Sequence, residues 1–531
     1  MTPGFHIADL FDITAEAVAN RWALVSDQRS VTYAALAERT DKLAAALAAE
    51  GLQRGQHVGI FLTNCPEYVE TFIALVKLGA VPFNVNYRYQ SEELVYLFNN
   101  ANAAAVVHGA SLASIVDEIE GRVPSLRMRI EVADVFDTGN GASLDYEALI
   151  QSADRPQQPF PRSEDDYLLL YTGGTTGMPK GVMWPHRAFF FACLGGGGLF
   201  HPSGPVTQPQ DIAERAQNGY QLRMLTVAPL MHGAAIWSAL AALLGGLTLV
   251  LDTSKTFDAD CIWSVIERHS VNIVQIVGDA MAIPLRDALK LHPGRWSLDS
   301  VVGFGSGGAV FSAHVKADIQ ELLPNVMITD GMGSSETGIS GMAEPSPDGM
   351  MRLNANEYQQ VIVEGRIGLV GETGLVGRAG HIPLGYYGDP EKTAEAFQEI
   401  AGQRWSITGD SGRLDADGKI TVFGRGSTCI NTGGEKVFPE EVEEVLRGHP
   451  HVFDAVVTAK PDERWGERVV AIVSSRRSHD PAPSYDDLKT FAAQHLAGYK
   501  VPREIIWVES IPRSPAGKQN YQWARSYALA H

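Results

Sequence analysis

Helices and short apolar strands alternate along most of this chain, and that alternation constrains its fold more than any other feature. A helix is predicted over residues 43–52, a strand over 58–62 and a second helix over 68–78. The unit returns with a predicted strand over 301–304, followed by one apolar helical face made of Phe311, Val315, Ile319, Leu322 and Leu323. This order predicts an α/β fold in which helices cover β-sheets.

The chain is long enough for more than one domain, because 531 residues exceed the size at which a single core stops growing. A glycine-rich stretch at 424–427 separates two patterns. After it comes a compact run of about 100 residues, enough for a small domain. Its predicted helices are 440–446 and 486–496, and its predicted strands are 455–457, 469–473 and 505–508. We therefore predict a large domain over residues 1–426 and a small one over 427–531.

Charge and composition narrow the class of partner. The formal net charge is −19, and the lysines and arginines are scattered, so no basic face for nucleic acid is expected. The hydrophobic share of 45% is that of an ordinary soluble globular protein. A small-molecule partner is the better prediction.

The cysteines and the N-terminus predict a cytoplasmic protein. Four cysteines are too few and too far apart for a disulfide framework or a zinc site, so we expect reduced thiols. The N-terminus lacks the basic start and apolar core of a secretory signal. The nearly uncharged stretch 234–251 is divided by Gly245 and Gly246. It predicts a buried helix and then a buried strand, and no stable membrane insertion.

The loop at 171–181 has the composition of a phosphate cradle. Glycines allow backbone N–H groups to close around an anion, hydroxyls add donors, and Lys180 supplies a positive charge. The order of residues differs from a Walker A loop, because Pro179 precedes the lysine and Gly181 follows it. The candidate anion-binding residues are Thr172, Gly173, Gly174, Thr175, Thr176, Gly177 and Lys180.

A second candidate segment, 331–337, follows a predicted strand at 326–329. Its carboxylate, Glu336, is placed by a tight turn at the strand end, where ligands of α/β folds usually bind. Mg²⁺ is commonly held by one or two carboxylates together with phosphate oxygens. Glu336 is therefore the predicted metal ligand, with a solvated turn glutamate as the alternative.

Three later residues complete a set of side chains that could bind a nucleotide. Asp410 follows a tight turn and can accept both hydroxyls of a ribose, Arg425 can contact ribose or phosphate, and Lys518 lies on a glycine turn. Each of them alone is more often part of a plain turn or a salt bridge. Taken together, in this order and at these separations, they specifically indicate a nucleotide-binding site.

With these motifs the chain resembles adenylate-forming acyl-CoA synthetases, the superfamily shared with firefly luciferase and the adenylation domains of peptide synthetases. The resemblance covers nearly the whole chain. It implies a large multi-layer N-terminal domain of β-sheets and helices and a small, mobile α+β C-terminal domain. It also implies a two-step reaction of a carboxylic acid with ATP, Mg²⁺ and coenzyme A.

The resemblance assigns roles position by position. Lys518 corresponds to the adenylation lysine, Glu336 to the magnesium carboxylate, and His232 to the gate beside the acyl and thiol tunnel, so these three are the implied catalytic residues. Gly173 stands where the family usually has serine, Met332 where an aromatic is frequent, and Ser427 at a hinge where Asp or Lys is commoner. The other implied cofactor-binding residues are Gly307, Gly308, Ala309, Gly333, Ser334, Ser335, Asp410, Arg425, Gly433, Gly434 and Glu435.

Within the superfamily the segments from Gly424 and from Arg513 look most like actinobacterial ligases for steroid side-chain acids. A bulky steroid-like, terpenoid or otherwise polycyclic or branched acid is therefore implied, in lipid or terpenoid metabolism. Fatty-acid ligation, delivery of the acyl-adenylate to a carrier protein or another enzyme, luciferase-like oxidation and a non-catalytic ATP sensor remain alternatives. So does a dinucleotide-binding dehydrogenase, because 303–308 satisfies Gly-x-Gly-x-x-Gly. The oligomeric state stays open, with a homodimer among the alternatives.

Overall fold

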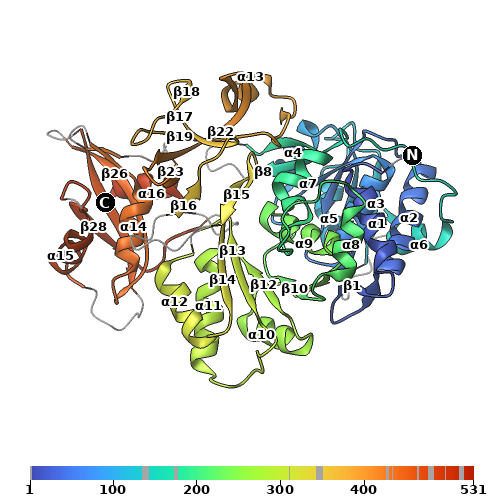
Figure 1. The fold of residues 1–531 in the computed structure, drawn as a ribbon, viewed down its shortest axis with the longest axis horizontal. Helices are drawn as coiled ribbons and strands as arrows, with labels where there is room; N and C mark the ends of the chain where they lie inside the picture. The colour runs from blue at the N-terminus through green and yellow to red at the C-terminus, as the bar shows by residue number, and fades with distance from the viewer. Residues whose placement is uncertain are drawn as a thin grey trace.

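The computed structural model shows a large N-terminal lobe and a small C-terminal lobe, which lies at the left of Figure 1. It describes residues 3–133, 143–172, 178–309, 311–342, 351–425, 430–432, 435–462, 466–475, 483–496, 498–513 and 519–531. The mixed α/β class predicted from the sequence is confirmed.

Two eight-stranded sheets form the framework of the large lobe. The first has the order β15 (Gly338–Met342), β14 (Met327–Ser334), β13 (Gly303–Gly307), β12 (Ile273–Ile276), β10 (Arg223–Thr226), β11 (Thr248–Val250), β1 (Trp22–Val25) and β2 (Ser30–Thr32). The second has the order β20 (Gly385–Tyr386), β9 (Lys180–Pro185), β8 (Tyr167–Thr172), β4 (Val81–Asn84), β3 (His57–Phe61), β5 (Ala103–Gly109), β6 (Met128–Val132) and β7 (Leu144–Asp145). The central strands β10, β12 and β13 of the first sheet and β3, β4 and β5 of the second are parallel and largely buried.

Helices fill the space between the two sheets and cover their outer faces. The largest core cluster joins both sheets through α1 (Ile7–Ala17), α2 (Tyr33–Ala49), α3 (Pro66–Leu78), α7 (His186–Cys193) and α9 (Gly233–Leu244). A second core lies under α10 (Ala259–Arg268), α11 (Gly278–Leu291) and α12 (Ala313–Leu322). A third lies under α4 (Ser91–Asn100) and α5 (Ala113–Glu118). The buried residues of α6 (Tyr146–Ser152) and α8 (Asp211–Asn218) belong to the first core.

A third, antiparallel sheet lies between the large lobe's framework and the small lobe (Figure 1). Its order is β16 (Met351–Asn354), β23 (Lys419–Arg425), β22 (Gln403–Leu414), β19 (Thr373–Ala379), β17 (Gln359–Val363) and β18 (Arg366–Ile367). In addition β21 (Phe397–Ile400) pairs with β22 after helix α13 (Pro390–Ala396).

In the described part of the small lobe there are one sheet and three helices. The strands are β25 (Glu435–Val437), β24 (Ile430–Thr432), β27 (Gly466–Ser475), β26 (Val452–Asp462) and β28 (Glu504–Val508), and the helices are α14 (Pro439–Arg447), α15 (Tyr485–His495) and α16 (Tyr521–Ala530). Contacts between described residues that join it to the large lobe include a ring pair and a hydrogen bond. The rings of Phe423 and Phe438 stack with centroids 4.9 Å apart. The backbone N–H of Ala313, at the start of α12, donates to the Glu444 carboxylate at 3.1 Å.

Most predicted elements are present, with shifted ends. The stretch 234–251 becomes α9 and β11, as expected, and within the described part of the chain no helix is both long and apolar enough to cross a membrane. The predicted strand at 301–304 starts later, because β13 occupies Gly303–Gly307. The first two glycines of the motif, Gly303 and Gly305, therefore lie inside a strand, whereas a dinucleotide fingerprint needs them in the turn after it, which removes the support for a dehydrogenase.

A stacked pair of buried histidines predicts acid sensitivity. The rings of His6 and His186 stack with centroids 4.0 Å apart. The two Nδ1 atoms accept the backbone N–H groups of Ala8 and Ile7. Burial is the largest cause of a pKa of about 4 for His186, and together with the neighbouring His186 it lowers the pKa of His6 further.

Because both folded-state pKa values lie below the unfolded value, the unfolded chain binds protons first as the pH falls below about 6.5. Stability is therefore fully present above that pH, and each histidine removes up to about 1.4 kcal/mol per pH unit as the pH falls toward 4. In His186→Asn the amide oxygen can still accept a backbone N–H. We therefore expect the melting temperature of this variant, measured in thermal unfolding scans, to fall less steeply than that of wild type as the pH is lowered from 6.5 toward 4. An identical pH profile for wild type and variant would contradict this.

Candidate active site

Lys180 and Glu336, predicted from separate motifs, both contact the side chain of Tyr386. Lys180 begins β9, Glu336 lies in the turn between β14 and β15, and Tyr386 ends β20, which pairs with β9. The Lys180 Nζ atom lies 5.0 Å from the centroid of the Tyr386 ring. The Tyr386 hydroxyl donates to Glu336 Oε1 at 3.0 Å. A cation and a carboxylate thus contact the same tyrosine, one at its ring and one at its hydroxyl, an arrangement that suits a phosphate group and its metal ion.

Hydrogen bonds from three directions fix the turn that carries Glu336. The indole N–H of Trp184, fully buried in β9, donates to the Ser335 carbonyl at 2.8 Å. The Ser406 hydroxyl donates to the Glu336 carbonyl at 2.9 Å. The Glu336 N–H donates to the Ser334 hydroxyl at 3.2 Å. These bonds place the carboxylate before any ligand arrives.

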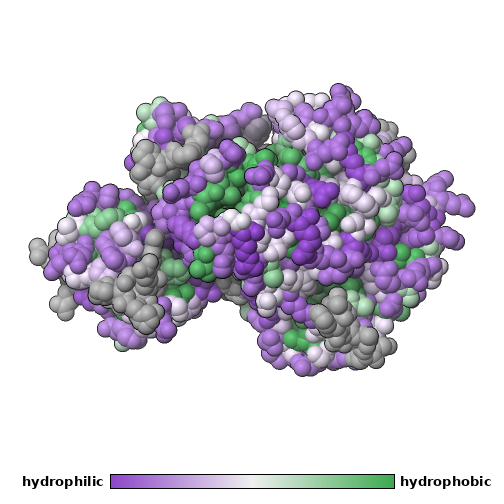
Figure 2. Space-filling model, turned by 90° about the horizontal axis from the view of Figure 1, so that it is seen from below, coloured by the Kyte–Doolittle hydropathy of each residue, from purple (hydrophilic) through white to green (hydrophobic). Residues whose placement is uncertain are grey.

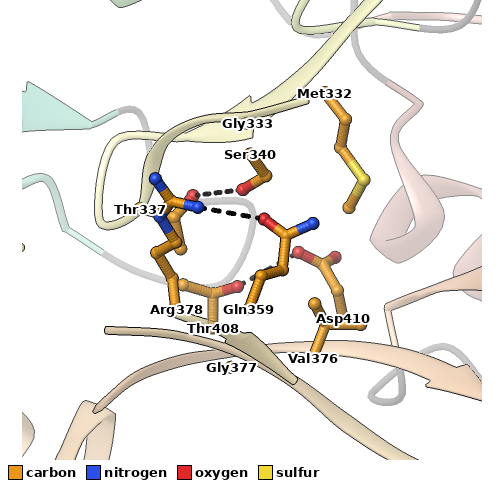
Figure 3. A pocket seen from close by; sticks show the side chains of 10 residues that line it. All are labelled: Met332, Gly333, Thr337, Ser340, Gln359, Val376, Gly377, Arg378, Thr408 and Asp410. Atoms are coloured by element: carbon orange, nitrogen blue, oxygen red, sulfur yellow. Dashed lines mark hydrogen bonds between the residues drawn. The ribbon is translucent and has the colours of Figure 1, made fainter. Parts of the chain in front are cut away.

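A pocket lies between the β14–β15 hairpin and the face of the third sheet (Figure 3). Met332 and Gly333 line it from the hairpin, and Asp410 lines it from β22. Asp410 accepts a hydrogen bond from the Thr408 hydroxyl at 3.1 Å. Gly333 has no room for a side chain, because a Cβ there would lie 2.2 Å from the Gly338 carbonyl oxygen. The predicted ribose carboxylate and the residue predicted beside the adenine therefore share one pocket.

Arg378 and Gln359 also line this pocket and were not predicted. The Arg378 guanidinium donates to the Gln359 amide oxygen at 3.3 Å, and burial lowers the pKa of Arg378. They face the hairpin because Gln359 and Arg378 are direct partners in the β17–β19 pairing.

The predicted adenine segment and the predicted gate lie on neighbouring elements of the large lobe. Gly307 pairs with Gly331, next to Met332, across β13 and β14. Gly308 has a φ of +88°, and a Cβ there would lie 3.9 Å from the Cβ of Ala234 on α9. Ala309 is half-buried. His232 is the residue before α9, and its carbonyl accepts the Ala235 and Ile236 N–H groups.

The structure describes several of the predicted site residues only in part and others not at all. Thr172 ends β8 and is paired with Lys180, so the two ends of the phosphate loop are paired. For Arg425 and Glu435 the backbone is described, in β23 and β25. The following predicted residues lie outside the described ranges: Gly173, Gly174, Thr175, Thr176, Gly177, Ser427, Gly433, Gly434 and Lys518.

The donor set fits a magnesium ion that shares its coordination with a substrate. Among the described residues there is no group of three or more His, Cys, Asp or Glu side chains that could hold a metal ion. Glu336 contacts the same tyrosine as Lys180, which suits Mg²⁺ bound through one carboxylate, phosphate oxygens and water.

Two family models match the chain and decide its family. The model for AMP-binding enzymes matches residues 11–369, and the model for the AMP-binding enzyme C-terminal domain matches residues 441–518. The chain belongs to the AMP-binding enzyme family. The resemblance predicted from its motifs is thereby confirmed.

Curated relatives of this AMP-binding enzyme include actinobacterial acid–CoA ligases. The 3-oxocholest-4-en-26-oate--CoA ligase of Rhodococcus rhodochrous is 40% identical over 534 residues, covering 98% of this chain and 95% of the relative. The medium-chain acyl-CoA ligase Mig of Mycobacterium avium is 38% identical over 551 residues, covering 99% of each. The predicted similarity to actinobacterial steroid side-chain ligases is confirmed.

Solved structures show the same fold. The anthranilate CoA ligase AuaEII in complex with anthranoyl-AMP superposes with a TM-score of 0.85 at 23% identity, covering 99% of this chain and 98% of that one. The amide bond synthetase McbA of Marinactinospora thermotolerans has a TM-score of 0.80 at 24% identity, with 98% and 99% covered. The two-lobe architecture of this AMP-binding enzyme is therefore that of the family.

Proposed function

We propose that this enzyme is an ATP-dependent, AMP-forming acyl-CoA synthetase that activates a bulky carboxylic acid, steroid-like or otherwise polycyclic. The observation that carries the proposal is the convergence of Lys180 and Glu336 on Tyr386, close to the pocket that contains Asp410. The names of the relatives support the substrate class, since one acts on a steroid-derived acid.

In the first step an oxygen of the substrate carboxylate attacks the α-phosphorus of ATP, the bond from that phosphorus to the bridging oxygen breaks, and pyrophosphate leaves. This step needs in-line positioning and charge neutralisation more than a base. Lys180 with residues 172–177 would hold the phosphates, Asp410 the ribose hydroxyls, and Met332 with Gly307, Gly308 and Ala309 the adenine. A Mg²⁺ ion held by Glu336 would neutralise phosphate charge. Lys518 would stabilise the charge that develops at the α-phosphate.

In the second step the thiolate of coenzyme A attacks the acyl carbon and AMP leaves. We place the boundary of the two lobes at 426/427, with Ser427 as the hinge, because the three sheets of the large lobe end at Arg425 and the next strand begins at Ile430 in the small lobe. Rotation there would withdraw Lys518 and bring Gly433, Gly434 and Glu435 to the site, beside the gate residue His232.

The three described cysteines are free thiols, which supports a cytoplasmic location.

Pyrophosphate exchange measured across linear fatty, aromatic, terpenoid and steroid acids tests the proposal. We expect the largest kcat/KM for a polycyclic acid, by roughly tenfold or more over a linear acid, since each methylene that fits a pocket contributes about 1–3 kcal/mol. A linear fatty acid as the best substrate would favour the alternative of a medium- or long-chain fatty-acid ligase, which the Mycobacterium avium relative supports. Exchange without thioester formation would favour delivery of the acyl-adenylate to another acceptor.

A further inference from the structure

Both ends of the segment that contains Lys518 are fixed to the small-lobe sheet. Arg513 and Gln519, which flank residues 514–518 in the sequence, pair with each other as an antiparallel β-bridge. Each of the two end residues also has a side chain bound to β26 or α14. The two anchors are chemically different.

The first anchor is an ion pair between Arg513 and Asp454 of β26. The Arg513 Nη2 atom lies 2.7 Å from Asp454 Oδ1 and 2.8 Å from Oδ2, and Nε lies 3.1 Å from Oδ2. The two side chains are only 18% and 11% exposed. A forked, largely desolvated pair of this kind fixes direction as well as distance.

The second anchor is a buried amide. The Gln519 Nε2 group donates to the Ala455 carbonyl at 2.8 Å and approaches Glu443 Oε2 at 3.5 Å. Glu443, on α14, is completely buried and also accepts the Val457 N–H at 2.9 Å and the Tyr521 hydroxyl at 3.2 Å. This carboxylate ties α14, β26 and the start of α16 together directly behind Gln519.

We propose that Asp454 and Glu443 are positioning residues for adenylation, because they hold the two ends of the segment that presents Lys518. The inference rests on the proposed function, in which Lys518 acts in the first half-reaction and is withdrawn in the second. Neither carboxylate touches substrate in this role. A catalytic group displaced by about 1 Å can lose on the order of 10² in rate.

The test separates the two half-reactions of the full-length enzyme carrying Asp454→Asn. Pyrophosphate exchange reports adenylation, and thioester formation from supplied acyl-adenylate reports the second step. We expect the kcat of adenylation to fall by about 10- to 100-fold with little change in the KM for ATP, and the thioester step to stay within about twofold of wild type. Asp454→Glu, which keeps the carboxylate, should recover part of the adenylation rate.

Glu504→Gln is the matched control. Glu504 pairs with Lys460 of β26 at 2.6 Å and with Arg468 at 2.8 Å, so its loss also breaks ion pairs in the small-lobe sheet. The ion pairs that the described residues make with Glu504 are those of Lys460 and Arg468, which lie outside the two anchors, so both half-reactions should stay near wild type. In a Lys518→Ala background, Asp454→Asn should cause no further loss of adenylation, because the group it positions is gone.

Hydrogen exchange of the amides of residues 514–518 gives a readout that does not depend on turnover. We expect exchange about tenfold faster in Asp454→Asn than in wild type or Glu504→Gln, because the variant loosens one anchor. Three results would each overturn the positioning role: unchanged hydrogen exchange in Asp454→Asn, equal rate losses in both half-reactions, or a loss of adenylation rate that adds to that of Lys518→Ala. A wild-type enzyme that adenylates no acid would instead contradict the proposed function, while the exchange result would still decide whether Asp454 anchors the segment.

Discussion

Replacing Lys518 by alanine is expected to lower the rate of acyl-adenylate formation by about 10² to 10³, the usual cost of removing a group aimed at charge that develops in the transition state. The second half-reaction should survive. Thioester formation from supplied acyl-adenylate is expected within a few-fold of wild type, because the proposed mechanism gives the ammonium group no part in thiol attack. Pyrophosphate exchange and a discontinuous thioester assay measure the two rates separately.

Lys489→Ala serves as the control for this substitution, since Lys489 is an exposed lysine of the same lobe, on α15. It should leave both rates unchanged. Near-normal pyrophosphate exchange in Lys518→Ala would remove Lys518 from the mechanism.

The second large effect is expected at Glu336. Glu336→Gln preserves the size of the side chain and an oxygen that can accept the Tyr386 hydroxyl, but it removes the charge. We expect adenylation to fall by about 10² and the Mg²⁺ concentration for half-maximal rate to rise, because a hard divalent ion prefers an anionic oxygen. Titration of the exchange rate with MgCl₂ measures both quantities.

Tyr386→Phe is the graded companion to this variant. It keeps the ring beside Lys180 and the charge of Glu336 and removes one hydrogen bond, so a loss of roughly two- to tenfold is expected, equivalent to about 0.5–1.5 kcal/mol. Wild-type activity of Glu336→Gln at every Mg²⁺ concentration would show that this carboxylate holds no metal ion.

The large-scale architecture could be predicted because strands and helices alternate with clear periodicity, but strand ends could not. The apolar pair Val301 and Val302 resembles the centre of a strand, yet β13 begins at Gly303. Space is tight at Gly305, where a Cβ would lie 2.6 Å from the Gln275 side-chain oxygen, so the Gln275 side chain would have to move. Similarly, the predicted turn at 331–334 is the end of β14, because these residues pair with β15.

The site was predicted where a motif marks it. Lys180, Glu336, Met332 and Asp410 belong to glycine-rich segments with an unusual order of residues, and the structure places them around one region. Tyr386, Gln359 and Arg378 were missed. They come from short strands whose partners are fixed by tertiary pairing, and no local pattern marks them.

The hydrogen bond from Ala313 to Glu444 has a consequence for the balance between lobe orientations. Glu444 satisfies a backbone donor in the first turn of α12, a place normally filled by a residue of the helix's own chain segment. Any swing that carries α14 away from α12 must return that N–H to water, at a cost of about 0.5–1.5 kcal/mol. This hydrogen bond thereby raises the population of the observed lobe orientation by a few-fold. Because its acceptor is a charged carboxylate, we expect its strength, and with it the ease of separating α14 from α12, to depend on salt concentration.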